Sequence, residues 1–337
     1  FRLHRLETID LSQLSALTYI GNASFIGIYG VQYPNISLML PNQCNLLMIG
    51  DNAFMRLEIN GDLDFSHCTQ LNHIGNGSFS LAKANSIRFA PNSPITYIGS
   101  NAFAYSSITE LDLDTLPNLE FLGGGAFRNS KVTKLDFSKT PNLTHIGRGV
   151  FEENNALINV NFSDSAALRY IGDWAFKKAK LTSLDLSGAP NLTFIGDRAF
   201  QSSPLQRLVL PASLQHIGSE AFHSNSLSHL DLSHLSSLKF IGDRAFSIAA
   251  FQVRNLETIH FPDQCAITYI GFGAFQTAGL SHLDLSGCKN LSYISNYAFT
   301  SSPLQTLQFD NPALSYIGIR AFSQGTMQSL DLSKIPN

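Results

Sequence analysis

The chain has 337 residues, of which 44% are hydrophobic and 14% are charged, and its formal net charge is −3. That much apolar material can form a sizeable core, which excludes a disordered chain. With 22 Lys and Arg against 25 Asp and Glu, the chain has no excess positive charge to neutralise phosphates, so we expect no nucleic-acid partner. No apolar run approaches the roughly 18 residues of a membrane-spanning helix, so we expect no membrane span in this chain.

A short block of sequence recurs from one end of the chain to the other. Its clearest copy reads Leu-Asp-Leu-Ser from Leu184, Leu-Thr-Phe-Ile-Gly from Leu192, and closes with Ala199 and Phe200. The period is about 24 residues, with longer intervals before Phe54 and Phe275, and it predicts a repeat protein. The closing Phe recurs thirteen times, at Phe25, Phe54, Phe79, Phe103, Phe127, Phe151, Phe176, Phe200, Phe222, Phe246, Phe275, Phe299 and Phe322.

The pattern inside one block predicts its local structure. Leu184 and Leu186 alternate with Asp185, which indicates a short strand with one apolar face. A second extended segment ends at Ile195, and the Gly that follows this Ile, or the Leu in its place, in 12 of 13 blocks predicts a sharp turn with φ > 0.

One block cannot bury its own Leu, Ile and Phe, but stacked blocks bury them against each other. Fourteen Leu-x-Leu cores can be read, the last beginning at Leu330. We therefore predict a mainly β repeat solenoid of about fourteen coils, with parallel stacked short strands and little regular helix, forming one domain over residues 1–337.

One block carries a family resemblance. Residues 210–218 read Leu-Pro-Ala-Ser-Leu-Gln-His-Ile-Gly and are followed by Ala221 and Phe222. This resembles, almost residue by residue, the leucine-rich repeats of BspA-like (treponemal-type) surface proteins, and the resemblance extends over essentially the whole chain. Most coils differ in carrying Asp-Leu-Ser instead of a Pro-ended strand, and Ser-rich positions where the family often has Cys. The resemblance implies a leucine-rich-repeat fold and an extracellular or cell-surface recognition or adhesion role.

Stacking places equivalent residues in columns, and the outward residue between the two strand leucines forms the first of them. Eight of its fourteen members are Asp, which favours a solvated polar face. One patch of this face is rich in imidazole and carboxylate groups, which are suitable ligands for zinc or a similar ion. The residues of this metal hypothesis are His229, Asp231, His260, His282 and Asp284.

A second column precedes the Ile-Gly pair, and twelve of its thirteen members are aromatic or His. We call it the aromatic column; it consists of Tyr19, Met48, His73, Tyr97, Phe121, His145, Tyr170, Phe194, His216, Phe240, Tyr269, Tyr293 and Tyr316. Strand alternation points these side chains away from the side that the Ile faces. Either they stack across coils as a packed ridge, or they form an exposed strip that recognises a protein or a sugar. The candidate binding residues are Tyr97, Phe121, Tyr170, Phe194, Phe240, Tyr269, Tyr293 and Tyr316.

The closing Phe has no polar partners in its pattern and is predicted to form a core spine. The four cysteines fall in adjacent coils, as Cys44 with Cys68 and Cys265 with Cys288. They are either small buried residues or two disulfides with that pairing.

No nucleophile elbow, P-loop or Cys-x-x-Cys pair is present, so we expect neither catalysis nor a cofactor. The favoured function is recognition of a protein or glycan on a host, matrix or neighbouring cell. The alternative is a structural spacer or a self-associating surface-layer element without an external ligand. Neither end shows the polar capping unit of a solenoid, so we expect a fragment of a longer chain.

Overall fold

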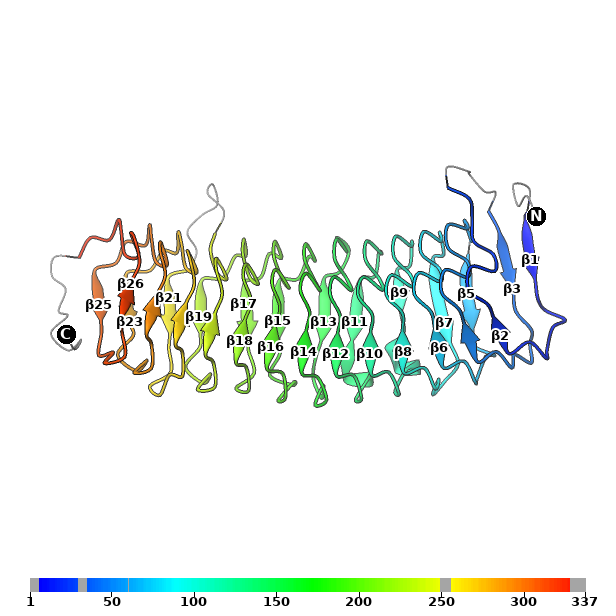
Figure 1. The fold of residues 1–337 in the computed structure, drawn as a ribbon, viewed down its shortest axis with the longest axis horizontal. Coiled ribbons are helices and arrows are strands. Elements are labelled where there is room, and N and C mark those ends of the chain that lie inside the picture. Colours follow the sequence, from blue (N-terminus) through cyan, green and yellow to red (C-terminus); the bar gives the residue numbers. More distant parts are fainter. Residues whose placement is uncertain (1–5, 30–34, 60, 249–255, 328–337) are drawn as a thin grey trace. The chain divides into compact units, whose positions relative to one another are not determined.

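A computed structural model describes residues 6–29, 35–59, 61–248 and 256–327. The chain divides into two compact units, which are residues 1–168 with 178–180 (unit 1) and residues 169–177 with 181–337 (unit 2). Each unit is a stack of short coils (Figure 1). In the described part of the chain, no helix is long and apolar enough to cross a membrane. That residues 1–337 form a single domain stays a prediction.

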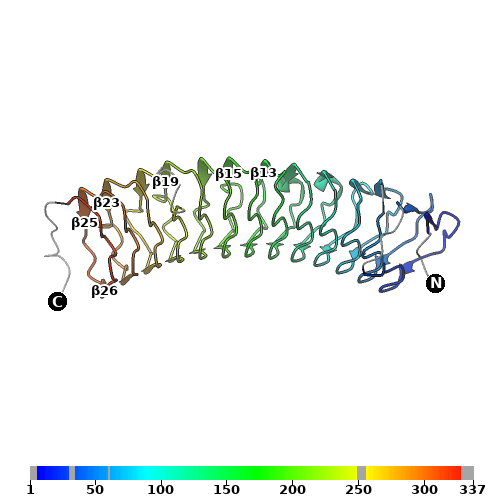
Figure 2. The ribbon, with the colours of Figure 1, turned by 90° about the horizontal axis from the view of Figure 1, so that it is seen from above.

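Each coil contributes two short strands, and Figure 2 shows that the first strands lie along one side of a unit and the second strands along the other. The first strands of unit 1 are β1 (Thr8–Asp10), β3 (Ser37–Met39), β5 (Asp62–Phe65), β7 (Ser86–Phe89), β9 (Glu110–Leu111), β11 (Lys134–Asp136) and β13 (Asn159–Asn161). Those of unit 2 are β15 (Ser183–Asp185), β17 (Arg207–Val209), β19 (His229–Asp231), β21 (Thr258–His260), β23 (His282–Asp284) and β25 (Thr306–Gln308).

The second strands are only two residues long and begin at the aromatic column. In unit 1 they are β2 (Tyr19–Ile20), β4 (Met48–Ile49), β6 (His73–Ile74), β8 (Tyr97–Ile98), β10 (Phe121–Leu122) and β12 (His145–Ile146). In unit 2 they are β14 (Tyr170–Ile171), β16 (Phe194–Ile195), β18 (His216–Ile217), β20 (Phe240–Ile241), β22 (Tyr269–Ile270), β24 (Tyr293–Ile294) and β26 (Tyr316–Ile317). Two 3-10 turns follow strands of unit 1, η1 (Leu113–Thr115) and η2 (Phe137–Lys139).

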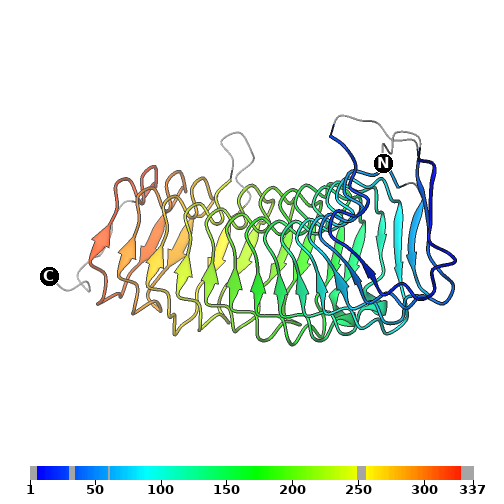
Figure 3. The same cartoon turned by 45° about the vertical axis from the view of Figure 1, so that its right-hand side comes forward.

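All strand pairs recorded within the two units are parallel and in register (Figure 3). Leu184 pairs with Leu208 in the first strands, and Ile195 pairs with Ile217 in the second strands. Equivalent residues of successive coils therefore lie side by side, and the predicted parallel β-solenoid is confirmed. Thirteen first strands are described; the fourteenth core, at Leu330, lies outside the described residues.

The core of each unit is a column of phenylalanine rings, as predicted. Phe200 is fully buried, and its ring centroid lies 5.2 Å from that of Phe176 and 5.4 Å from that of Phe222. The planes differ by only 5° and 3°, so the rings stack face to face along the unit. Leucine and isoleucine from the two strand columns pack around this spine and are buried with it.

The conformation predicted for the repeated glycine is wrong. In the coils of Gly196 and Gly218, the residue with positive φ comes two positions later, at Arg198 and Glu220 (both 56°). The glycine is needed for a different reason: a Cβ on Gly218 would lie 2.5 Å from the carbonyl carbon of Gly196 and 2.6 Å from the backbone nitrogen of Asp197. Close approach of neighbouring coils, and not a left-handed turn, therefore requires the glycine.

Candidate functional site

The aromatic column of unit 2 is a continuous stack of seven rings, each at the first position of a second strand. Successive ring centroids lie 4.3–5.4 Å apart and successive planes differ by 1–18°. The rings from Tyr170 to Tyr293 are half-buried and that of Tyr316 is exposed. In unit 1, His73, Tyr97 and Phe121 stack in the same way, at 5.4 and 5.6 Å. The rings thus stack across coils, as the packed-ridge alternative predicts, and each ring is also partly exposed to solvent.

Stacking decides which part of each ring a ligand can reach. Because the faces of the inner rings cover one another, the column presents ring edges and polar tips. The hydroxyl of Tyr269 donates a hydrogen bond to Asp243 Oδ1 (3.3 Å), and that of Tyr316 donates to Asn296 Oδ1 (3.3 Å). An inner ring therefore has no free face on which a sugar could stack.

A ladder of Asp and Asn side chains borders the column and was not identified from sequence. The side chain after the repeated Gly accepts a hydrogen bond from a backbone N–H of the next coil, as Asp197 Oδ1 does from Ser219 (2.7 Å) and Asp243 Oδ1 does from Phe272 (2.8 Å). The signal that could have revealed it is the recurrence of Asp or Asn at this position. The ladder joins successive coils beside the rings and so holds the column in place.

The environment of the column changes the protonation of its polar members. Burial raises the pKa of Tyr170 and Tyr269, and the nearby Asp carboxylates raise it further, so both phenols remain hydrogen-bond donors at neutral pH. Burial between Phe194 and Phe240 lowers the pKa of His216, although Asp197 opposes this effect. His216 is therefore a neutral ring in the stack at neutral pH.

The Asp column on the first strands has a structural role. Asp185 Oδ1 accepts hydrogen bonds from the Ser187 backbone N–H (2.9 Å) and from the Ser187 hydroxyl (2.6 Å). These bonds lower the pKa of Asp185. The same backbone bond recurs at Asp64, Asp231 and Asp284, so the Asp-x-Ser motif closes the turn after the strands that carry it.

The residues of the metal hypothesis do not converge on one point. The Nδ1 atoms of His229 and His282 contact the hydroxyls of Thr258 (2.8 Å) and Thr306 (2.7 Å). Among the residues that the structure describes, no group of three or more His, Cys, Asp or Glu side chains could hold a metal ion. His260, His282 and Asp284 instead line a cavity of about 380 Å³ on the first-strand side of unit 2.

The cysteines form two disulfides between adjacent coils. Cys44 is bonded to Cys68 in unit 1, with their Cα atoms 4.6 Å apart, and Cys265 is bonded to Cys288 in unit 2, with a Cα separation of 4.4 Å. Of the two alternatives left open by the sequence, the structure thus has the bonded one.

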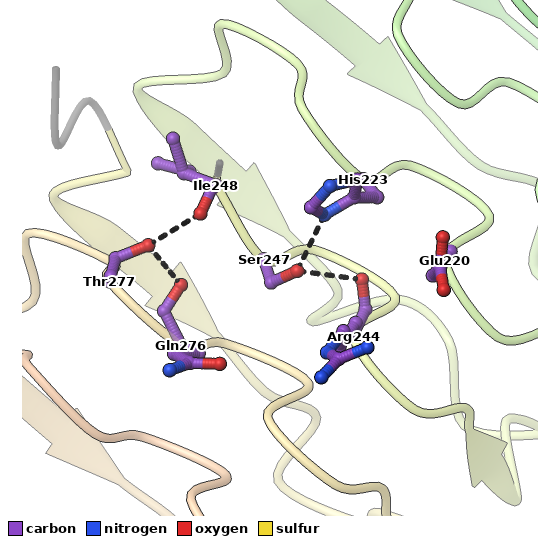
Figure 4. Close-up of a pocket in the computed structure, with 7 residues that line it drawn as sticks. All are labelled: Glu220, His223, Arg244, Ser247, Ile248, Gln276 and Thr277. Carbon is purple, nitrogen blue, oxygen red and sulfur yellow. Dashed lines mark hydrogen bonds between the residues drawn. The ribbon is translucent and has the colours of Figure 1, made fainter. Parts of the chain in front are cut away.

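A further cavity, of about 340 Å³, lies at the turns on either side of the closing Phe in three successive coils of unit 2 (Figure 4). No residue around it was singled out from sequence, because its walls combine turn positions that are variable within the repeat. Its lining residues are Glu220, His223, Arg244, Ser247, Ile248, Gln276 and Thr277.

In-register parallel strands with an inward leucine column define a leucine-rich-repeat protein. The chain belongs to the BspA type leucine rich repeat family, whose repeat region matches residues 1–133, 120–250 and 236–336. No curated protein matches the chain.

Several solved leucine-rich-repeat structures are similar. A leucine-rich repeat protein from Bacteroides ovatus is 18% identical, with 91% of this chain and 68% of that chain covered and a TM-score of 0.51. The functional domain of InlJ from Listeria monocytogenes, which includes a cysteine ladder, is 18% identical, with coverages of 98% and 59% and a TM-score of 0.48. A leucine rich cell surface protein from Faecalibacterium prausnitzii is 18% identical, with coverages of 87% and 83% and a TM-score of 0.37. At this identity, the Bacteroides similarity shows the fold alone.

Proposed function

We propose that this chain is a non-catalytic recognition module that binds a protein partner through the aromatic column. The observation that carries the proposal is the unbroken row of half-exposed rings in unit 2, from Tyr170 to Tyr316. Tyrosine is enriched where proteins bind each other, because it adds apolar area and a hydroxyl at small entropic cost. Short strands joined by the Asp and Asn ladder hold these rings in fixed positions before a partner arrives.

Ring orientation favours a protein over a glycan as the partner. Sugars are commonly held against an exposed aromatic face, and the inner rings of the column have none. A row of ring edges alternating with hydroxyl tips suits the mixed apolar and hydrogen-bonding surface of another protein. The acidic and imidazole groups of the first-strand side already bond to Ser and Thr neighbours, which agrees with a role without catalysis.

An extracellular or cell-surface location is part of the proposal. Its support is the pair of disulfides, since such bonds form and persist mainly in oxidising compartments. The partner would then lie on a host, in a matrix or on a neighbouring cell.

A structural role is the second candidate, and the stacking itself favours it. Each ring buries its faces against neighbouring coils, so the column also stiffens the unit. A spacer or a self-assembling surface element would use the rings in this way without any external ligand.

The test is binding of the purified chain to an array of matrix proteins and glycans. The variant carries Tyr269→Ser, Tyr293→Ser and Tyr316→Ser; the control carries Ser183→Ala, Arg207→Ala and Gln308→Ala on exposed first-strand positions. We expect the wild type and the control to bind a matrix protein and the Tyr variant to lose that binding while its circular dichroism is unchanged.

Equal binding by the Tyr variant contradicts the role of the column, and glycan-only binding contradicts the protein partner. If the wild type binds nothing, light scattering separates the structural alternatives. Oligomers that grow with concentration indicate self-assembly, and a monomer at all concentrations indicates a spacer.

A further inference from the structure

Some polar side chains of the cavity at the turns of unit 2 already have hydrogen-bond or ion-pair partners within the protein, and others do not. Glu220 has such partners. Its carboxylate accepts from Arg198 Nε and a terminal guanidinium nitrogen, both at 3.1 Å, and from Gln201 Nε2 at 2.6 Å. The Arg198 hydrogen bonds lower the pKa of Glu220, so it is ionised and its charge is balanced.

The hydroxyl groups of the cavity are also engaged. Ser247 Oγ contacts His223 Nδ1 (2.7 Å) and donates to the carbonyl oxygen of Arg244 (3.2 Å), while Thr277 Oγ1 donates to the carbonyl oxygen of Ile248 (2.9 Å) (Figure 4). Burial lowers the pKa of His223, so the imidazole is neutral at neutral pH. None of these groups adds charge to the cavity.

Arg244 is not engaged in the same way. Its guanidinium carbon lies 5.2 Å from the centroid of the Phe272 ring, a cation–π contact. In the part of the chain that the structure describes, no carboxylate lies within 4.0 Å of this guanidinium. The side-chain amide of Gln276 also has no hydrogen bond to another residue lining the cavity (Figure 4). Arg244 is exposed, and its charge lowers the pKa of Glu220, although the ion pair of Glu220 is with Arg198. Two arginines thus face one carboxylate, so the cavity keeps one positive charge in excess beside the Gln276 carboxamide.

We propose that this cavity binds the carboxylate of an acidic side chain from a protein partner. A guanidinium presents two parallel N–H donors that match the two oxygens of a carboxylate. The Arg244 guanidinium lies over the Phe272 ring, and this contact uses the face of the guanidinium and not its N–H donors. Gln276 supplies a further donor, and buried Ile248 provides an apolar wall for the methylene groups of the side chain. A volume of about 340 Å³ lies at the small end of ligand pockets and is large enough to admit one side chain.

This site is independent of the aromatic column, because it lies at the turns around the closing Phe and shares no residue with the column. Either proposal can fail while the other holds. A partner could use both surfaces, with the column providing area and the cavity selecting an acidic residue.

The test is an NMR titration of the whole chain with the blocked tripeptide Ala-Glu-Ala, with blocked Ala-Gln-Ala as the uncharged peptide. The reporters are the Nε–Hε signal of Arg244, assigned by its absence in Arg244→Gln, and the backbone amides of Ser247 and Thr277. The control variant is Arg320→Gln, which changes an exposed arginine at the equivalent turn position. Because Trp174 and Tyr297 occupy this position with similar φ (58° and 61°), Gln fits its backbone conformation and the variant is expected to fold.

We expect the Glu peptide to shift all three signals and the Gln peptide to shift none. Loss of a bidentate charge-assisted pair should weaken binding at least about tenfold in Arg244→Gln. Arg320→Gln should bind as the wild type does. Equal shifts by both peptides, or equal weakening in both variants, overturn the proposal. Shifts caused by glucuronate but not by the Glu peptide also overturn it, because the site would then be one for acidic sugars.

Discussion

Replacing Phe200 by Ala tests the physical basis of the solenoid, which is burial between coils. Phe200 is fully buried and is stacked on both sides, by Phe176 and Phe222. Truncation of a buried Phe costs about 3–5 kcal/mol, because the transfer free energy of the ring is lost and a cavity remains. With two stacked partners, each worth about 0.5–1.5 kcal/mol, we expect Phe200→Ala to lie near the upper end, at about 4–5 kcal/mol of unfolding free energy.

Phe322 offers a matched control, because Phe322→Ala removes the same atoms. Its ring is partly exposed and, among the described residues, stacks on Phe299 alone at 5.3 Å, with an edge contact to Phe309 at 5.7 Å. We expect Phe322→Ala to cost at most about half as much as Phe200→Ala, since less area is removed from the core.

The assay is urea unfolding of the whole chain followed by circular dichroism, with amide hydrogen exchange of β16 and β18 to locate the loss. Opening near Phe200 should increase exchange in both strands, since each coil is supported by its neighbours. A loss below about 2 kcal/mol for Phe200→Ala, or equal losses for the two variants, would refute the reasoning.

Two further predictions follow from contacts between coils. Gly218→Ala should lower the unfolding free energy by several kcal/mol in the same urea assay, because its Cβ would lie 2.5 Å from the Gly196 backbone. Gly21→Ala is the control and should cost much less, because the nearest atom to its Cβ would belong to the Ser24 side chain, at 3.1 Å. Equal losses of stability in the two variants would contradict close approach of the coils as the cause. His216→Phe should reduce the loss of stability between about pH 7 and 5, measured by urea unfolding at each pH. The pKa of His216 is lower in the folded state than in the unfolded state, so as pH falls the unfolded state becomes protonated before the folded state does. The stability that is present above about pH 6.5 is therefore lost as pH falls through the folded pKa. Identical pH slopes in the two proteins would show that His216 is not titrating in the stack.

The solenoid itself was predictable from sequence because its evidence is local and repeated. A Leu-x-Leu strand has a period of two, and a block of about 24 residues that recurs thirteen times places like residues side by side. The closing Phe spine, the cysteine pairing and the membership of the aromatic column all follow from this regularity. Each depends only on which coil a residue belongs to, and not on how its side chain is turned.

The candidate sites needed the tertiary structure, because they depend on distances between coils. Only the approach of neighbouring backbones shows why Gly218 is a glycine, and only side-chain packing decides that the inner rings of the column offer edges instead of faces. The cavity beside Arg244 joins turn residues of three coils whose identities vary from coil to coil. The period of the sequence determines which residues share a column. The chemistry of each surface depends on which of its polar side chains are already hydrogen-bonded to neighbouring coils, and only the tertiary structure shows this.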